Sequence, residues 1–119
     1  MLAHHYKLDN LCVVIDNNLQ IDGRIDDVMS PHPIPEKLRA FGFAVQEIDG
    51  HDFDQMEAAF AKARATKGVP TAIIMKTLKG KGVSYMEDQA AWHGKAPNDA
   101  EYAQAMDELN QRLNELEGK

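Results

Sequence analysis

The residues best suited to chemistry lie in a short run near the start of the chain, IDNNLQIDG at residues 15–23. This run follows an apolar stretch, Leu11 to Ile15, that is typical of a buried strand. Its tandem asparagines and later Asp-Gly predict a turn at the carboxyl end of that strand, where open α/β sheets bind their ligands. Asparagine oxygens and loop carbonyls suit Mg²⁺, which usually brings phosphate with it. The run therefore predicts part of a metal–diphosphate site, with Asn17 and the carbonyl of Leu19 offered to the metal.

A plainer interpretation of the same run is purely structural. Asn17 and Asn18 could simply form the turn that follows the strand, because asparagine tolerates left-handed backbone conformations. The residue types alone slightly favour this structural role over a metal site.

A second group of candidate residues lies in the loop of residues 77–97 and just before it. Its lysines could place positive charge on a phosphate and its glycines could let the backbone approach one closely; these residues are Lys76, Lys79, Lys81, Gly80 and Gly82. His93 could hydrogen-bond a phosphate or move a proton. The alternatives are a solvated flexible loop and a histidine packed beside Trp92.

Three strands and three helices are expected to position these two loops. The strands are predicted at Leu11–Ile15, Phe43–Ile48 and Thr71–Lys76, and the helices from about Pro35 to Gly42, from Asp52 to about Thr66, and after Asn98. The continuous apolar character of the first strand predicts burial on both faces, with Cys12 as a small core residue. The order β-α-β-α-β-α predicts a small three-layer parallel sheet of the α/β class. The loops after the first and third strands are then expected to meet at one edge of that sheet.

Two of the helices have capping signals and apolar faces. Asp52 with Gln55, and Asn98 with Glu101, have the spacing of a capping box. The first of these helices is expected to bury Met56, Ala59, Phe60 and Ala63. The second has an apolar stripe that could pair with another chain but more simply docks on the core; it consists of Tyr102, Met106, Leu109, Leu113 and Leu116.

Length and composition restrict the classes of function. The chain has 119 residues, enough for one domain, with 13 basic and 19 acidic residues and a net charge of −6. This charge argues against a general surface for nucleic acid or anionic membrane. No apolar run approaches the ~20 residues of a membrane span. The single cysteine, and first residues that are not expected to form a secretion signal, are consistent with a reducing cytoplasmic setting.

Many segments, in order and over nearly the full length, carry a resemblance to a known family. They are AHHYKLDNL (3–11), IDNNLQIDG (15–23), VMSP (28–31), RAFGF (39–43), EIDGHD (47–52), PTAIIMKTLKGKGVSYMED (70–88) and WHGKAPN (92–98). The chain resembles the second half of the thiamine-diphosphate-binding domain of transketolase, of the type in which that domain belongs to an N-terminal subunit. QIDG at 20–23 and WHGK at 92–95 resemble transketolase more than pyruvate dehydrogenase or deoxyxylulose-phosphate synthase. Residues 1–119 are accordingly expected to be a single partial domain, part of a thiamine-diphosphate-binding fold.

The resemblance implies roles for individual residues. Asn17 matches the asparagine whose side chain coordinates the divalent metal, Mg²⁺, and Leu19 matches the residue whose main-chain carbonyl does the same. Ile21 matches an apolar residue beside the cofactor. Lys79 and His93 match the lysine and histidine that approach the diphosphate and the reacting centre, with His93 as the catalytic candidate.

The implied reaction is transfer of a two-carbon ketol unit from a ketose phosphate to an aldose phosphate, the transferase chemistry of the pentose phosphate pathway. The resemblance also implies that the family's metal-binding aspartate lies upstream of residue 1, and that the pyrimidine-binding domain lies elsewhere. The isolated chain is therefore expected to be inactive and to bind neither thiamine diphosphate nor Mg²⁺ well. Its expected partner is the missing transketolase subunit or domain, or a second copy in a homo-oligomer. The alternative function is a non-catalytic, oligomerising interaction module or a relic of a transketolase gene.

Overall fold

The computed structural model describes residues 1–118, which form two compact units. The first unit contains Met1–Asn18 and Met29–Thr77, and the second contains Leu19–Val28 and the chain from Leu78 onward. The chain passes between the units after Asn18, after Val28 and after Thr77.

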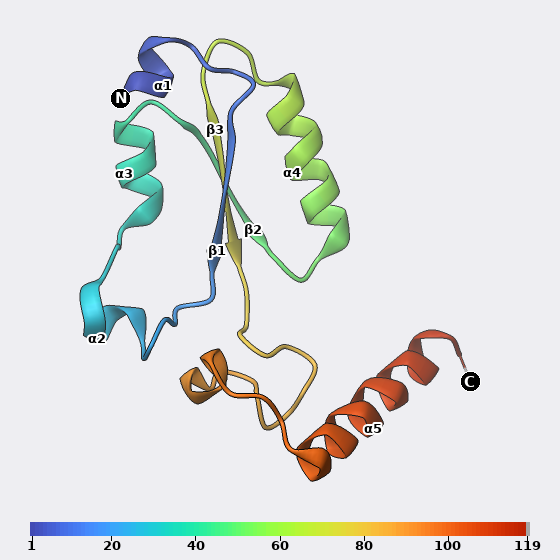
Figure 1. The fold of residues 1–119 in the computed structure, drawn as a ribbon. Helices are drawn as coiled ribbons and strands as arrows, with labels where there is room; N and C mark the ends of the chain where they lie inside the picture. Colours follow the sequence, from blue (N-terminus) through green and yellow to red (C-terminus); the bar gives the residue numbers. More distant parts are fainter. Residues whose placement is uncertain (119) are drawn as a thin grey trace. The chain divides into compact units, whose positions relative to one another are not determined.

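The first unit is built on a parallel sheet of three strands (Figure 1). The strands are β1 (Cys12–Asn17), β2 (Ala44–Asp49) and β3 (Thr71–Lys76), in the spatial order β1-β3-β2. Asn17 and Asp49 are both register partners of Lys76. The carboxyl ends of all three strands therefore lie at one edge of the sheet, as the sequence predicts. The predicted strands match the observed ones to within two residues at each end.

Two helices cover the sheet from opposite sides and give the unit its three layers (Figure 1). They are α3 (Ile34–Ala40) and α4 (Phe53–Ala65). The core forms where Ala59 and Ala63 of α4 pack on Ile73 of the central strand, and Phe60 packs partly buried against them. Of the four residues expected on the inner face of α4, Ala59 and Ala63 are buried, whereas Met56 is only half-buried like Phe60.

The N-terminus of α4 is capped by Asp52, as predicted, but the partner residue acts differently. The Gln55 amide donates to Asp52 Oδ1 at 3.0 Å, which is the expected cap. The Gln55 side chain then bonds to the Asp52 carboxylate and to the amide of Asp49, not to the backbone of the capping residue. These bonds to Gln55 lower the pKa of Asp52.

The predicted burial of β1 on both faces is wrong. Burial alternates along the strand, so that Cys12 is exposed and Val14 retains 45% of its surface. The reason is position, because β1 lies at the edge of the sheet and β3 takes the centre. An apolar run shows that a strand can be buried, but not which place in the sheet it takes. Cys12 is thus not a core residue of the unit.

The second unit combines two loops with the long helix α5 (Asp99–Leu116). The loop after Leu78 contains a 3₁₀ helix, η1 (Ala90–His93). Residues 25–29 form the short helix α2 (Ile25–Met29), whose last residue belongs to the first unit. Neither α2 nor the N-terminal helix α1 (Leu2–His5) was expected from the sequence. No helix within residues 1–118 is long and apolar enough to cross a membrane.

Helix α5 begins with the predicted capping box, formed by Asn98 and Glu101 in both directions. The predicted docking of its apolar stripe on a core is wrong for the described residues. All five stripe residues are exposed, with Leu113 at 51% and Leu116 at 79%. The helix is bonded to the loop of its own unit through Glu101 and Glu108, and Ala105 on the same face is buried. The attachment of α5 to its loop thus includes polar contacts from the face beside the stripe.

Candidate functional site

The tandem asparagines follow directly from β1 in the first unit. The Asp16 carboxylate accepts hydrogen bonds from the Thr77 hydroxyl and from the Asn18 side chain, the latter at 3.4 Å. The carbonyl of Asn17 accepts from the Thr77 amide at 3.4 Å. The side chain of Asn17 is half-buried and makes no hydrogen bond within residues 1–118. Its amide oxygen is therefore available to an external ligand, whereas Asp16 and Asn18 have partners.

The left-handed residue of this run is Leu19, with φ of 62°, and neither asparagine has a positive φ. The structural interpretation of the tandem asparagines, which relied on their tolerance of that conformation, therefore does not describe this turn. A leucine in the left-handed region costs about 1–2 kcal/mol. The Leu19 side chain is 38% exposed, so its burial does not explain the conformation. The conformation fixes the direction of the carbonyl, which accepts from the Ile25 amide at 2.9 Å.

Residues 19–25 form a closed turn in the second unit. Gln20 and Arg24 make an isolated antiparallel bridge, and the Ile21 amide donates to the Gly23 carbonyl at 2.9 Å. The side chain of Ile21 is exposed. An exposed isoleucine on a hydrogen-bonded turn provides an apolar surface at a fixed position.

The loop of residues 78–88 is closed on itself in the same unit. The Asp88 amide donates to the Lys79 carbonyl at 3.0 Å. Gly80 has a φ of 73°, and a Cβ at this position would lie 2.5 Å from the carbonyl oxygen of Met86. The amide of Gly82 donates to the Glu87 carboxylate at 3.0 Å. Gly80 thus allows close packing within the loop, whereas the amide of Gly82, which was expected to face a phosphate, binds a carboxylate.

His93 ends η1 and is exposed, so the alternative of a packed histidine is not what the structure has. Its neighbour Trp92 is the residue that packs. The Trp92 ring nitrogen donates to the Tyr85 carbonyl at 3.1 Å, and the ammonium group of Lys95 lies 4.1 Å from the centre of the ring. Trp92 therefore anchors η1, and the imidazole beside it faces solvent.

Glu101 and Glu108 of α5 hold the loop that carries these residues. The Tyr85 hydroxyl donates to the Glu101 carbonyl at 2.6 Å, and Lys95 pairs with the Glu101 carboxylate at 2.7 Å. The amide and hydroxyl of Ser84 each donate to the Glu108 carboxylate at 2.6 Å. The bonds from Lys95 and Asn98 lower the pKa of Glu101, and those from Ser84 lower the pKa of Glu108. Burial, with a smaller effect of both carboxylates, raises the pKa of Tyr85.

Asp88 joins the two loops of the second unit and was not found from the sequence. Its carboxylate accepts hydrogen bonds from the Gln20 side-chain amide and from the Arg24 guanidinium, the latter at 3.4 Å. The partners lie 68 and 64 residues away along the chain, so no local pattern signals the contact. Of the predicted site residues, Leu19, Ile21, Lys79 and His93 lie in this unit and Asn17 ends the strand of the other.

Residues 1–114 match the sequence model of the transketolase thiamine diphosphate binding domain. The chain belongs to this family. This confirms the resemblance found in the motifs, over nearly the whole length of the chain.

Curated members of the family are similar to the chain over a part of their length. The chain is 40% identical to a subunit of apulose-4-phosphate transketolase from Phocaeicola vulgatus, over 98% of the chain and 42% of that protein. It is 37% identical to the SqwG subunit of 6-deoxy-6-sulfo-D-fructose transketolase from a Clostridium species, over 92% of the chain and 40% of that protein. The chain thus spans about two-fifths of the length of these relatives.

Solved transketolase structures have the same fold. A transketolase from Campylobacter jejuni matches with a TM-score of 0.81 and 28% identity, over 92% of the chain and 17% of that structure. A transketolase from Pichia stipitis matches with a TM-score of 0.79 at 23% identity, over 92% of the chain and 16% of that structure, which supports the fold alone. The α/β class and parallel sheet expected from the sequence are those of the transketolase thiamine-diphosphate-binding domain.

Two oxygen atoms of the predicted metal turn, one in each unit, are of the kind that a hard divalent cation prefers. Mg²⁺ prefers octahedral oxygen coordination and keeps water and phosphate among its ligands. The chain offers the Asn17 amide oxygen and the second lone pair of the Leu19 carbonyl, which a single hydrogen bond leaves available. Within residues 1–118, no group of three or more His, Cys, Asp or Glu side chains could hold a metal ion. The remaining ligands would have to come from outside these residues.

Proposed function

We propose that this chain contributes to a transketolase-type enzyme that transfers a two-carbon ketol unit from a ketose phosphate to an aldose phosphate. Residues 1–119 would form the C-terminal half of its thiamine-diphosphate-binding domain. The observation that carries the proposal is the family match over residues 1–114. It is joined by the Asn17 side chain, which has no hydrogen bond among the described residues, and by a left-handed Leu19 at the predicted metal turn.

In this proposal the residues of the chain bind and orient the cofactor and its metal. Asn17, through its amide oxygen, and Leu19, through its carbonyl, are two ligands of Mg²⁺. Ile21 excludes water beside the cofactor. Lys79 places an ammonium charge on the diphosphate, and His93 hydrogen-bonds there or moves a proton at the reacting centre. Thiamine diphosphate supplies the carbanion chemistry when it is bound.

Two of the relatives are named as subunits, and the chain covers about two-fifths of each. We therefore propose that the active species contains the other half of this domain and a pyrimidine-binding subunit. We call this assembly the completed enzyme. The same names mention a sugar phosphate and a sulfonated sugar, so both classes are suitable donors to test. Neither nucleic acid nor membrane has a role in the proposal, and a cytoplasmic location suits it.

Calorimetric titration with thiamine diphosphate and Mg²⁺ tests the proposal directly. We expect the completed enzyme to bind the pair with micromolar affinity and to transfer ketol units. The 119-residue chain alone should show no micromolar binding, because it offers Mg²⁺ two neutral oxygen donors and, within residues 1–118, no cluster of acidic side chains to balance the metal charge. Micromolar binding by the lone chain would contradict the proposal that the other half of the domain is needed for the site. Absence of binding by the completed enzyme would contradict the proposed function.

A matched pair of variants separates the two interpretations of the tandem asparagines. In the completed enzyme, Asn17→Ala removes a proposed metal ligand, and the Mg²⁺ concentration for half-maximal cofactor binding should rise about tenfold or more. Asn18→Ala changes the adjacent residue, whose side chain bonds to Asp16, and should have a much smaller effect. Equal effects of the two substitutions would indicate a role in the turn rather than in metal binding.

The alternative function, a self-associating module without catalysis, has an observation of its own. The apolar stripe of α5 is exposed, and β1 and β2 are the edge strands of the sheet. Exposed apolar stripes and open sheet edges favour association between chains. A completed enzyme that binds no cofactor, together with concentration-dependent association of the chain, would favour this alternative.

A further inference from the structure

Asp88 has a strained backbone conformation, and neither the fold nor the proposed metal ligands explain it. Its φ is 55°, in the left-handed region, although it is not a glycine. Its amide closes the loop of residues 78–88 on the Lys79 carbonyl. Asp88 therefore combines three features: its amide closes this loop, its backbone is left-handed, and its carboxylate bonds to the 19–25 turn.

The two carboxylate oxygens of Asp88 are divided between the two residues of one bridge. Oδ1 accepts from the Gln20 side-chain amide and Oδ2 from the Arg24 guanidinium at 3.4 Å. Gln20 and Arg24 are themselves paired as an antiparallel bridge, directly inside the Leu19–Ile25 hydrogen bond. A contact to both members of the bridge restrains the turn, whereas a contact to only one would let it rotate.

We infer that Asp88 is a positioning residue that fastens the 19–25 turn, with the Leu19 carbonyl, to the loop that carries Lys79. Its carboxylate acts through Gln20 and Arg24 and does not itself touch metal or cofactor. The consequence of this linkage rests on the proposed function: it would align the Leu19 carbonyl, as a metal ligand, with Lys79, which binds the diphosphate. The linkage itself can be tested on the chain without any cofactor.

The test of the linkage is amide hydrogen exchange at Ile25 in the 119-residue chain. Asp88→Gly keeps the left-handed conformation available but removes the carboxylate, so it separates the side-chain role from the backbone role. We expect the Ile25 amide to exchange about fivefold faster, because an exposed charge-assisted contact of this kind is modest in strength. Asp88→Asn keeps an acceptor for Gln20 and should restore most of the protection.

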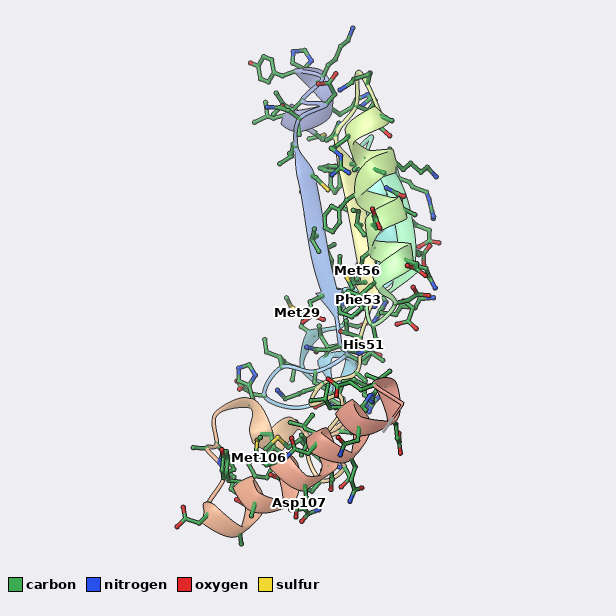
Figure 2. The ribbon with its side chains drawn as sticks, turned by 90° about the vertical axis from the view of Figure 1, so that its right-hand side faces the viewer. Met29, His51, Phe53, Met56, Met106 and Asp107 are labelled. Carbon is green, nitrogen blue, oxygen red and sulfur yellow. The ribbon has the colours of Figure 1, made fainter. Side chains whose placement is uncertain are left out.

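Asp107 provides the matched control. It lies on α5 of the same unit (Figure 2), is exposed, and makes no side-chain hydrogen bond or ion pair within the described residues. Because glycine would also weaken a helix at this position, Asp107→Ala is the suitable control for loss of one carboxylate. It should leave exchange at Ile25 unchanged. Unchanged exchange at Ile25 in Asp88→Gly would overturn the linkage.

The consequence for the metal is tested in the completed enzyme. With thiamine diphosphate saturating, Asp88→Gly should raise the Mg²⁺ concentration for half-saturation about fivefold, and Arg24→Ala should do the same. The double variant should be no worse than Asp88→Gly alone, because that substitution already removes the contact that Arg24→Ala removes. Additive losses, or an unchanged Mg²⁺ requirement, would overturn the positioning role. Failure of the wild-type completed enzyme to bind the pair would instead contradict the proposed function and leave the exchange result standing.

Discussion

At the scale of single residues, Leu19 is where backbone conformation and proposed chemistry coincide. Its φ of 62° is compatible with glycine and incompatible with proline, which fixes φ near −65°. If the carbonyl is the metal ligand, Leu19→Gly in the completed enzyme should keep the Mg²⁺ requirement within roughly twofold of wild type. Leu19→Pro should raise it about tenfold or more, because the carbonyl is turned away. Mg²⁺ titration of cofactor binding measures both.

The contrast between these two variants identifies the part of Leu19 that matters. Hydrogen exchange of the amides in β3 serves as the control, since that strand lies in the other unit and should be unaffected. If Leu19→Gly were as damaging as Leu19→Pro, the leucine side chain would be the functional group and the main-chain role would be wrong.

At the scale of elements, the attachment of the loop to α5 depends on carboxylates. Hydrogen bonds from the Ser84 hydroxyl and amide lower the pKa of Glu108 from its ordinary 4.5, so the charged form is favoured in the folded state. The stabilisation is therefore complete above pH 4.5 and is lost as the pH falls through the lowered pKa. Trp92 is the one tryptophan of the sequence and bonds to the residue after Ser84, so its fluorescence should report loosening of the loop below pH 4.5.

Glu108→Gln tests the origin of that acid response. The variant should have a looser loop at neutral pH and a smaller fluorescence change on acidification, with the remainder due to Glu101, whose pKa is also lowered. Asp107→Asn, at the adjacent position of α5, should keep the wild-type profile. A wild-type acid response in Glu108→Gln would show that Ser84 and Glu108 do not hold the loop.

The elements also show how far a sequence prediction can reach. Local signals worked: the caps Asp52 and Asn98 and the limits of β3 are set by residues close together in the chain, so they are visible in the sequence. The predictions that Cys12 is buried and that the α5 stripe docks on a core were wrong. Each depends on which element packs beside the residue in the fold, and the local sequence does not show this. In the candidate site, the two loops were found, but the Asp88 contact, 68 residues apart from Gln20, was not.

At the scale of the whole molecule, the exposed apolar surface of α5 is the feature that most affects behaviour in solution. The stripe of Tyr102, Met106, Leu109, Leu113 and Leu116 is exposed along a helix of 18 residues. Burial of apolar surface contributes about 25 cal/mol per Å², so a second copy that covers the stripe would gain stability from the contact. We therefore expect the average mass of the 119-residue chain, measured by light scattering, to rise with concentration.

Two substitutions on α5 that add the same charge locate the association surface. Leu113→Glu places a carboxylate within the stripe and should shift association to higher concentration, because burying an unpaired charge is costly. Gln111→Glu adds an equal charge outside the stripe and should leave association unchanged. If the chain associates and Leu113→Glu does not weaken it, the open edges of the sheet are the contact and the stripe is not. A wild-type chain that stays monomeric at every concentration would remove the basis for self-association, and the partner for this face would then be the rest of the completed enzyme.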